Sequence, residues 1–107
     1  TPSAKYANKS GGNIGIGEFK VQTGLIAPIE GFDIDARFNI ESYKINVIRG
    51  NNVLHSVLNH GGRIEISNQY IIDQVKIGDK IIFENIFVKM LGLEKSQKLN
   101  SLIFEIE

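Results

Sequence analysis

Residues 31–49 read GFDIDARFNIESYKINVIR and carry the most regular hydrophobic pattern of the chain. In the first ten of them, apolar side chains alternate with polar ones and stand at Phe32, Ile34, Ala36, Phe38 and Ile40. A period of two places apolar side chains on one face of a β-strand. After Glu41 the apolar positions are Tyr43, Ile45 and Val47. The alternation slips by one residue near Ser42, so we expect a strand with a β-bulge or a bend there.

Length and composition predict one folded domain. The chain has 107 residues, of which 42% are apolar and 22% charged, and these are ordinary values for a globular protein. Residues 1–12, TPSAKYANKSGG, are small, polar and basic without periodicity, so we expect a linker there and a single domain over residues 13–107. Because the first residue is Thr1 rather than Met, we expect a piece of a longer protein.

The balance of charges excludes several classes of partner. Twelve basic and twelve acidic residues cancel, so the chain lacks the positive charge expected of a nucleic-acid binder or of a protein that contacts anionic membranes. It contains no cysteine, which excludes disulfides, thiolate metal sites and a cysteine nucleophile. We therefore expect neither nucleic acid nor direct membrane contact.

The remaining pattern predicts mostly strands. The expected strands cover residues 13–21 at an edge, 31–49, 53–58, 63–66, 80–89 and 99–107, and the last two pair antiparallel. Between them, Gly50-Asn51-Asn52 favours a hairpin turn, and residues 22–30 form an irregular crossing. Ser67 is the expected cap of a helix near residues 68–77, which ends at Gly78.

These elements predict an all-β fold that is mostly antiparallel. The two architectures that fit are a β-sandwich and a twisted sheet with the helix against one side. From the alternation we expect the core to include Phe32, Ile34, Phe38, Phe83 and Phe104.

The titratable residues form no recognisable active site. His55 and His60 could supply two Zn²⁺ ligands, but the nearby sequence offers no others. Asp33 and Asp35 share one strand face and could act as paired carboxylates or Ca²⁺ ligands, but a solvated face beside Arg37 is the commoner case. No phosphate-binding loop, nucleophile elbow or helical zinc motif occurs. We expect no enzyme activity, catalytic residue, metal or cofactor.

Several apolar residues do not fit one inward face, namely Ile48, Ile77, Ile82, Leu93 and Ile103. A two-sheet core or a helix cover would account for most of them, and an interface for the others. A polar loop that carries two leucines is hard to explain otherwise, so the candidate interaction surface consists of Leu91, Leu93 and Ile103.

Four segments of the chain carry a resemblance to a known family. They are KSGGNIGIGEF (9–19), EFKVQTGLIAPIEGFDIDARFNIESYKI (18–45), IGDKIIFENIFVK (77–89) and KLNSLIFEI (98–106). They are similar to the linker and strands of the C-terminal domain of the GldM/PorM proteins, which serve gliding motility and type IX secretion in Bacteroidetes. The chain departs from that pattern at Ser101, in the loop 91–98 and over residues 51–63.

The resemblance implies a periplasmic interaction module without catalytic residues. Its parent protein would be a homodimer anchored in the inner membrane and driven by a proton-powered motor, and its far end would contact ring components near the outer membrane. An alternative function is a small β-sandwich that binds a glycan, and a third is a hydrolase or metalloenzyme. Tyr6, Tyr43 and Tyr70 are scattered and tryptophan is absent, which argues against a glycan site.

Overall fold

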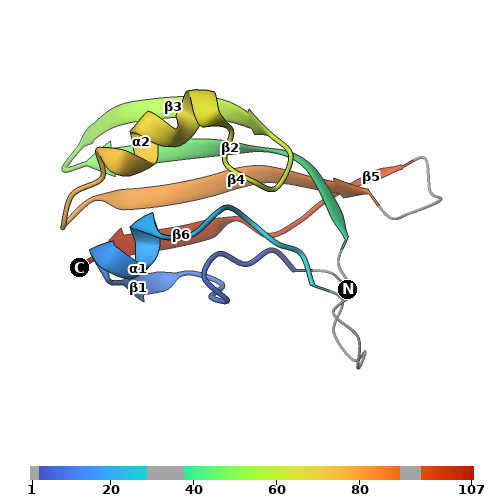
Figure 1. Cartoon of the computed structure of the whole chain (residues 1–107), viewed down its shortest axis with the longest axis horizontal. Helices are drawn as coiled ribbons and strands as arrows, with labels where there is room; N and C mark the ends of the chain where they lie inside the picture. The colour runs from blue at the N-terminus through green and yellow to red at the C-terminus, as the bar shows by residue number, and fades with distance from the viewer. Residues whose placement is uncertain (1–2, 29–37, 90–94) are drawn as a thin grey trace.

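A computed structural model describes residues 3–28, 38–89 and 95–107, and one six-stranded sheet dominates these parts of the chain (Figure 1). Its strands are β1 (Gly12–Ile14), β2 (Asn39–Arg49), β3 (Asn52–His60), β4 (Lys80–Lys89), β5 (Ser96–Lys98) and β6 (Leu102–Ile106). The strand order is β1-β6-β4-β2-β3, and β5 pairs with β4. Only the pair of β1 with β6 is parallel among these strands. The all-β, mostly antiparallel class is confirmed, and the described strands form one sheet with short covering elements.

The predicted bend in the long strand is confirmed. The register between β2 and β4 shifts on both sides of Ser42. Ile40 and Tyr43 are both buried, although an unbroken strand would place them on opposite faces. β4 has a matching irregularity at Asn85, which has a φ of 52°. The two strands therefore change phase at the same level of the sheet. Of the other expected core positions in this stretch, Phe32, Ile34 and Ala36 lie outside the described residues.

The hairpin and the later helix agree with the sequence pattern in part. β2 and β3 are joined through Gly50, whose φ is 60°. A 3-10 turn, η1 (Ile66–Asn68), leads into α2 (Gln69–Asp73), which is shorter than the expected helix. Ser67 lies inside η1 and makes no capping hydrogen bond there, so that expectation is wrong. The strand expected at residues 63–66 is also wrong, because only Arg63 forms an isolated bridge.

The first expected strand is wrong over most of its length. It is a strand only at its start, in β1, and it continues as a second short helix, α1 (Ile16–Lys20). Ile14 and Phe19 are both buried, whereas Ile16 is only partly covered. A spacing of three from Ile16 to Phe19 fits a helical turn better than a strand. The edge position of β1 agrees with the expectation.

The N-terminal segment, for which the sequence pattern predicts a linker, places two side chains in the core over its described part. Ala4 and Tyr6 are fully buried. The ring centroid of Tyr6 lies 5.0 Å from that of Phe19, 5.0 Å from that of Phe83 and 5.7 Å from that of Phe104. Its hydroxyl donates a hydrogen bond of 2.6 Å to the backbone carbonyl of Phe19, and burial raises the pKa of this hydroxyl. Tyr6 thus joins α1 to two strands of the sheet.

A tight turn holds Tyr6 in place and stores backbone strain. The backbone groups of Tyr6 and Lys9 exchange two hydrogen bonds of 3.0 and 2.9 Å. The intervening Ala7 and Asn8 have φ values of 54° and 59°, as in a type I′ turn. Asparagine tolerates this left-handed conformation, whereas alanine has a Cβ that opposes it.

We expect Ala7→Gly to raise the free energy of unfolding by about 0.5–1 kcal/mol, since relief of strain exceeds the added entropy of the unfolded chain. Urea unfolding measures the change. Ala4→Gly is the matched control, because Ala4 is buried and does not have positive φ. It should destabilise the protein. A loss of stability in Ala7→Gly equal to that in Ala4→Gly would contradict the assignment of strain to this turn.

A charged clamp joins the ends of four elements. The carboxylate of Asp79 is almost fully buried and accepts hydrogen bonds of 2.8 and 2.9 Å from Nε and Nη2 of Arg49, at the end of β2. It also accepts one of 2.9 Å from the backbone N–H of Lys76, which follows α2. Gly78, with a φ of 96°, donates its N–H to the carbonyl of Ile106 in β6, and Ile106 donates in turn to the carbonyl of Asp79. These contacts explain physically why glycine and aspartate precede β4.

Candidate functional site: the outer face of the sheet

The sheet has one face in the core and one that the described residues leave largely uncovered, which we name the outer face. Side chains alternate along strands, so residues between the core positions point to this second face. Its apolar members are Ile48, Val53, Leu58, Ile82, Phe87 and Ile103. Val53 is 63% exposed, Leu58 56% and Ile103 50%. Exposed apolar residues collected on one sheet face are typical of a contact surface.

Cross-strand pairing decides which of these residues are neighbours. Ile82 lies opposite Ile103, and Ile48 lies opposite Val53. Directly opposite side chains have Cβ atoms about 4.5–5.5 Å apart, so each pair forms a small apolar unit.

A polar row lies among these apolar pairs. Asn46 of β2 donates a hydrogen bond of 3.0 Å to the carboxylate of Glu84 and accepts one of 2.7 Å from Ser56. Lys44 lies opposite Glu84 in the register of β2 and β4. The outer face therefore combines apolar contact area with oriented polar groups, as protein interfaces do.

The structure describes one of the three residues of the sequence-predicted surface. Ile103 lies on the outer face, half exposed, near the start of β6. Leu91 and Leu93 lie outside the described residues, so their place on this surface stays a prediction. Ile48 and Ile82, which did not fit the inward face in the sequence, also belong to the outer face.

Sequence reasoning missed Val53, Leu58 and Phe87. Phe87 reaches the outer face because the irregularity at Asn85 reverses the alternation of β4. Val53 and Leu58 belong to β3, which is an edge strand of the sheet among the described residues. If the alternation of inward and outward side chains is counted from Phe83 and shifted by one residue at Asn85, Phe87 falls on the outer face.

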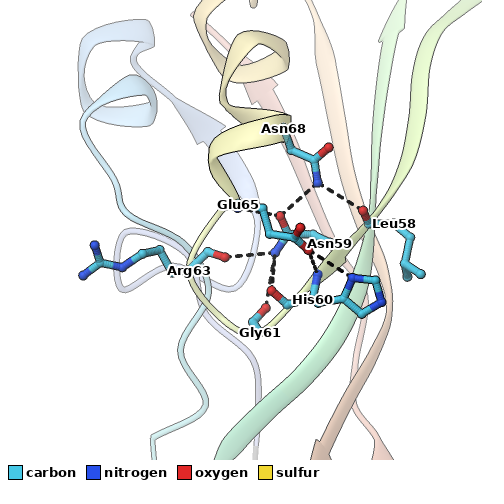
Figure 2. Close-up of polar contacts among 7 residues, drawn as sticks. All are labelled: Leu58, Asn59, His60, Gly61, Arg63, Glu65 and Asn68. Atoms are coloured by element: carbon cyan, nitrogen blue, oxygen red, sulfur yellow. Dashed lines mark hydrogen bonds and ion pairs between the residues drawn. The ribbon is translucent and has the colours of Figure 1, made fainter.

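A polar network fixes the end of β3 and the segment that follows it (Figure 2). Asn59 is fully buried, and its side-chain oxygen accepts hydrogen bonds from the backbone N–H of Glu65 at 2.8 Å and from Nδ2 of Asn68 at 3.1 Å. Its amide donates to the carbonyl of Arg63 at 3.0 Å. Asn59 therefore uses both ends of its side chain to shape the loop before η1.

The same network covers part of the exposed edge of β3. Asn68 donates a hydrogen bond of 3.0 Å to the carbonyl of Leu58, and the backbone N–H of His60 donates to the carboxylate of Glu65 (Figure 2). This backbone hydrogen bond, together with the His60 ring 3.1 Å away, holds the pKa of Glu65 below its usual range. Side chains that bind edge amides block pairing with another strand. The role of this network is to stabilise the fold at the edge of β3.

The two histidines are separated by the sheet. His55 lies opposite the core residue Val47, and its ring packs edge-to-face on Tyr70 with centroids 5.7 Å apart. His60 lies opposite Ser42 on the other face. Residues five apart in a strand point to opposite faces, so one metal ion cannot bind both rings. Over residues 3–28, 38–89 and 95–107 no group of three or more potential metal ligands occurs. Asp33 and Asp35 lie outside this part.

Comparison with known proteins identifies the family. The family described as the GldM C-terminal domain matches residues 1–107, which is the whole chain. A search of curated proteins finds no significant match. Within the described residues, no helix has the length and apolar character needed to cross a membrane. The family is that of a component of gliding motility and type IX secretion. The resemblance noted in the sequence is thus confirmed, and the chain belongs to the GldM C-terminal domain family.

Proposed function

We propose that this chain is a non-catalytic protein–protein interaction module of an envelope complex for gliding motility or type IX secretion. The family of this chain is that of a component of gliding motility and type IX secretion, and the outer face of the sheet offers a surface for contact. The observation that carries the proposal is the collection of half-exposed apolar residues on that face, with Ile103 as its most exposed member in β6. A stable sheet does not need an exposed isoleucine there, whereas an interface does.

The finer assignment follows the family. We infer a periplasmic domain within an inner-membrane-anchored homodimer, with partners among the ring components near the outer membrane. The isolated domain should bind these partners weakly, because the intact dimer presents two copies and gains avidity from them. We propose that Leu91 and Leu93 extend the surface beyond β4, on the strength of the sequence alone.

The glycan alternative has less support. Glycan sites use exposed aromatic rings, yet Tyr6 and Tyr43 are fully buried. Tyr70 is exposed, but it lies on α2 and packs against His55.

The proposal predicts that a charge on the outer face abolishes partner binding without unfolding the domain. We expect Ile103→Glu in the intact protein to reduce capture of its envelope partners at least roughly tenfold, because the loss of an interface hot-spot residue costs about 2 kcal/mol or more. Pull-down from cross-linked cells with quantitative mass spectrometry measures this loss. The double variant Leu91→Asp, Leu93→Asp tests the predicted extension in the same assay.

Val21→Glu is the matched control, since Val21 is 75% exposed and lies at the end of α1, away from the outer face. It should retain capture. Unchanged capture by Ile103→Glu, with the melting temperature preserved, would eliminate the outer face. A wild-type protein that captures no envelope protein but binds a specific glycan on an array would favour the alternative function.

A further inference from the structure

A hollow of about 370 Å³ is lined by residues of α2, of the segment that follows it and of the end of the sheet at which β2 turns into β3. Its volume falls near the lower end of the range for small-molecule sites, roughly 300–1,000 Å³. Its floor consists of Val47, Ile71 and Val75, all buried in the core. The hollow is on the core side of the sheet, so it is separate from the outer face.

The irregular pairing of β2 and β3 adds an apolar wall. Val47 pairs with His55 and Ile48 with Val53, which leaves Leu54 without a partner in the register. Leu54 and His55 both line the hollow, and Leu54 is 40% exposed. The bulge therefore presents an apolar side chain at the mouth of the hollow.

The rim is positively charged, although the chain as a whole is neutral. Lys20, Arg49 and Lys76 line it, against one carboxylate, that of Asp73. With Asp79 behind Arg49 also counted, positive charges still exceed negative ones by three to two. Cations on an apolar cavity favour an anionic ligand that also carries an apolar group.

Some hydrogen-bond donors on this rim already bind an acceptor, and two others take no part in the hydrogen bonds of the described residues. The ammonium group of Lys20 donates a hydrogen bond of 2.9 Å to the carbonyl of Asp73, and Nη2 of Arg49 donates to Asp79. In the hydrogen bonds of the described residues, Nη1 of Arg49 and the ammonium group of Lys76 have no part. These two groups can each donate to a carboxylate oxygen.

We propose that this hollow binds a carboxylate attached to a short, branched apolar group. The apolar group would rest against Leu54 and the ring of His55, and the carboxylate would meet Lys76 and Arg49 at the rim. A free organic acid and the carboxyl end of a peptide share this chemistry. The proposal does not depend on the function of the outer face.

Titration of the ¹⁵N-labelled protein followed by NMR tests the proposal. The probes are 4-methylpentanoate as the free acid and N-acetylglycyl-leucine as the peptide end, each beside its neutral amide. We expect both acids to shift the amides of Leu54, His55 and α2, with saturation below about 50 mM, because ligands of this size reach only millimolar affinity. The neutral amides should bind at least roughly fivefold more weakly. Tighter binding by the peptide acid would identify a peptide end as the natural source, and tighter binding by 4-methylpentanoate a free acid.

Variants of single lysines test which positive charge binds the carboxylate of the ligand. Lys76→Gln should weaken binding of the acids at least roughly threefold and leave the weak binding of the amides unchanged. Lys98→Gln is the matched control, because Lys98 is exposed on β5. It should bind like the wild type. Absence of shifts with either acid, equal affinity for acid and amide, or unaltered binding by Lys76→Gln would each overturn the proposal.

Discussion

Replacement of Tyr6 by alanine should destabilise the protein by about 3–5 kcal/mol, as expected for a large aromatic residue removed from a core. Tyr6 is fully buried, contacts three phenylalanine rings and donates a hydrogen bond to Phe19. Because a domain of this size has a total stability of about 5–15 kcal/mol, the loss is a large part of it. Thermal or urea unfolding measures the change, and both should show one cooperative transition for the wild type, since we propose that the segment folds with the domain.

Two variants separate packing from hydrogen bonding at this position. Tyr6→Phe keeps the ring and should cost only about 1–2 kcal/mol, because it leaves the carbonyl of Phe19 without its donor. Ser10→Ala, at an exposed position of the same segment, should have little effect. A Tyr6→Ala protein that melts within a degree or two of the wild type would show that residues 1–12 form a linker after all.

Replacement of Asp79 by alanine should cost roughly 3 kcal/mol, because a buried carboxylate that accepts three hydrogen bonds is removed and its donors lose their partner. The loss should loosen the junction of α2, β2, β4 and β6 that this residue holds. Chemical unfolding of Asp79→Ala and Asp79→Asn gives the magnitude. Asp73→Ala is the matched control, since Asp73 is exposed. Equal losses of stability in Asp79→Ala and Asp73→Ala would contradict the role of Asp79 in holding this junction together.

The clamp also predicts a pH dependence. Arg49 holds the pKa of Asp79 below its usual value, so the folded state binds this proton less tightly than the unfolded state does. The contribution of Asp79 is therefore fully present above the ordinary carboxyl pKa of about 4 and is lost as the pH falls through the lower, folded-state value. Stability measured from about pH 6 down to 2 should fall less steeply in Asp79→Asn than in the wild type. If stability falls equally steeply with pH in Asp79→Asn and in the wild type, the low pKa of Asp79 does not contribute to stability.

The sequence predicted the parts of the fold that depend on local pattern. Alternation identified the buried faces of β4 and β6, including Phe83 and Phe104, and the slip near Ser42 located the irregularity of β2. Phe38, another expected core residue, is only partly buried and packs against the core. The turn at Gly50 followed from its backbone chemistry.

The parts that were not predicted depend on contacts distant in sequence. Tyr6 stands alone among small polar residues, and its burial is decided by Phe83 and Phe104, which follow much later in the chain. A helix as short as α1 is unstable without tertiary packing, so its pattern is weak. On the outer face, alternation was sufficient for Ile103 but not for Phe87, because the phase of β4 changes at Asn85.

Photo-crosslinking in living cells tests whether the outer face contacts another protein of the envelope complex. Benzoylphenylalanine in place of Ile103 in the intact protein reports contacts of this face, and the same residue in place of Val21 reports contacts of the opposite side. We predict covalent adducts with an envelope protein from position 103, identified by mass spectrometry, and none from position 21. Adducts from position 21 alone, or from neither position in cells that glide and secrete, would show that the outer face is not the contact surface.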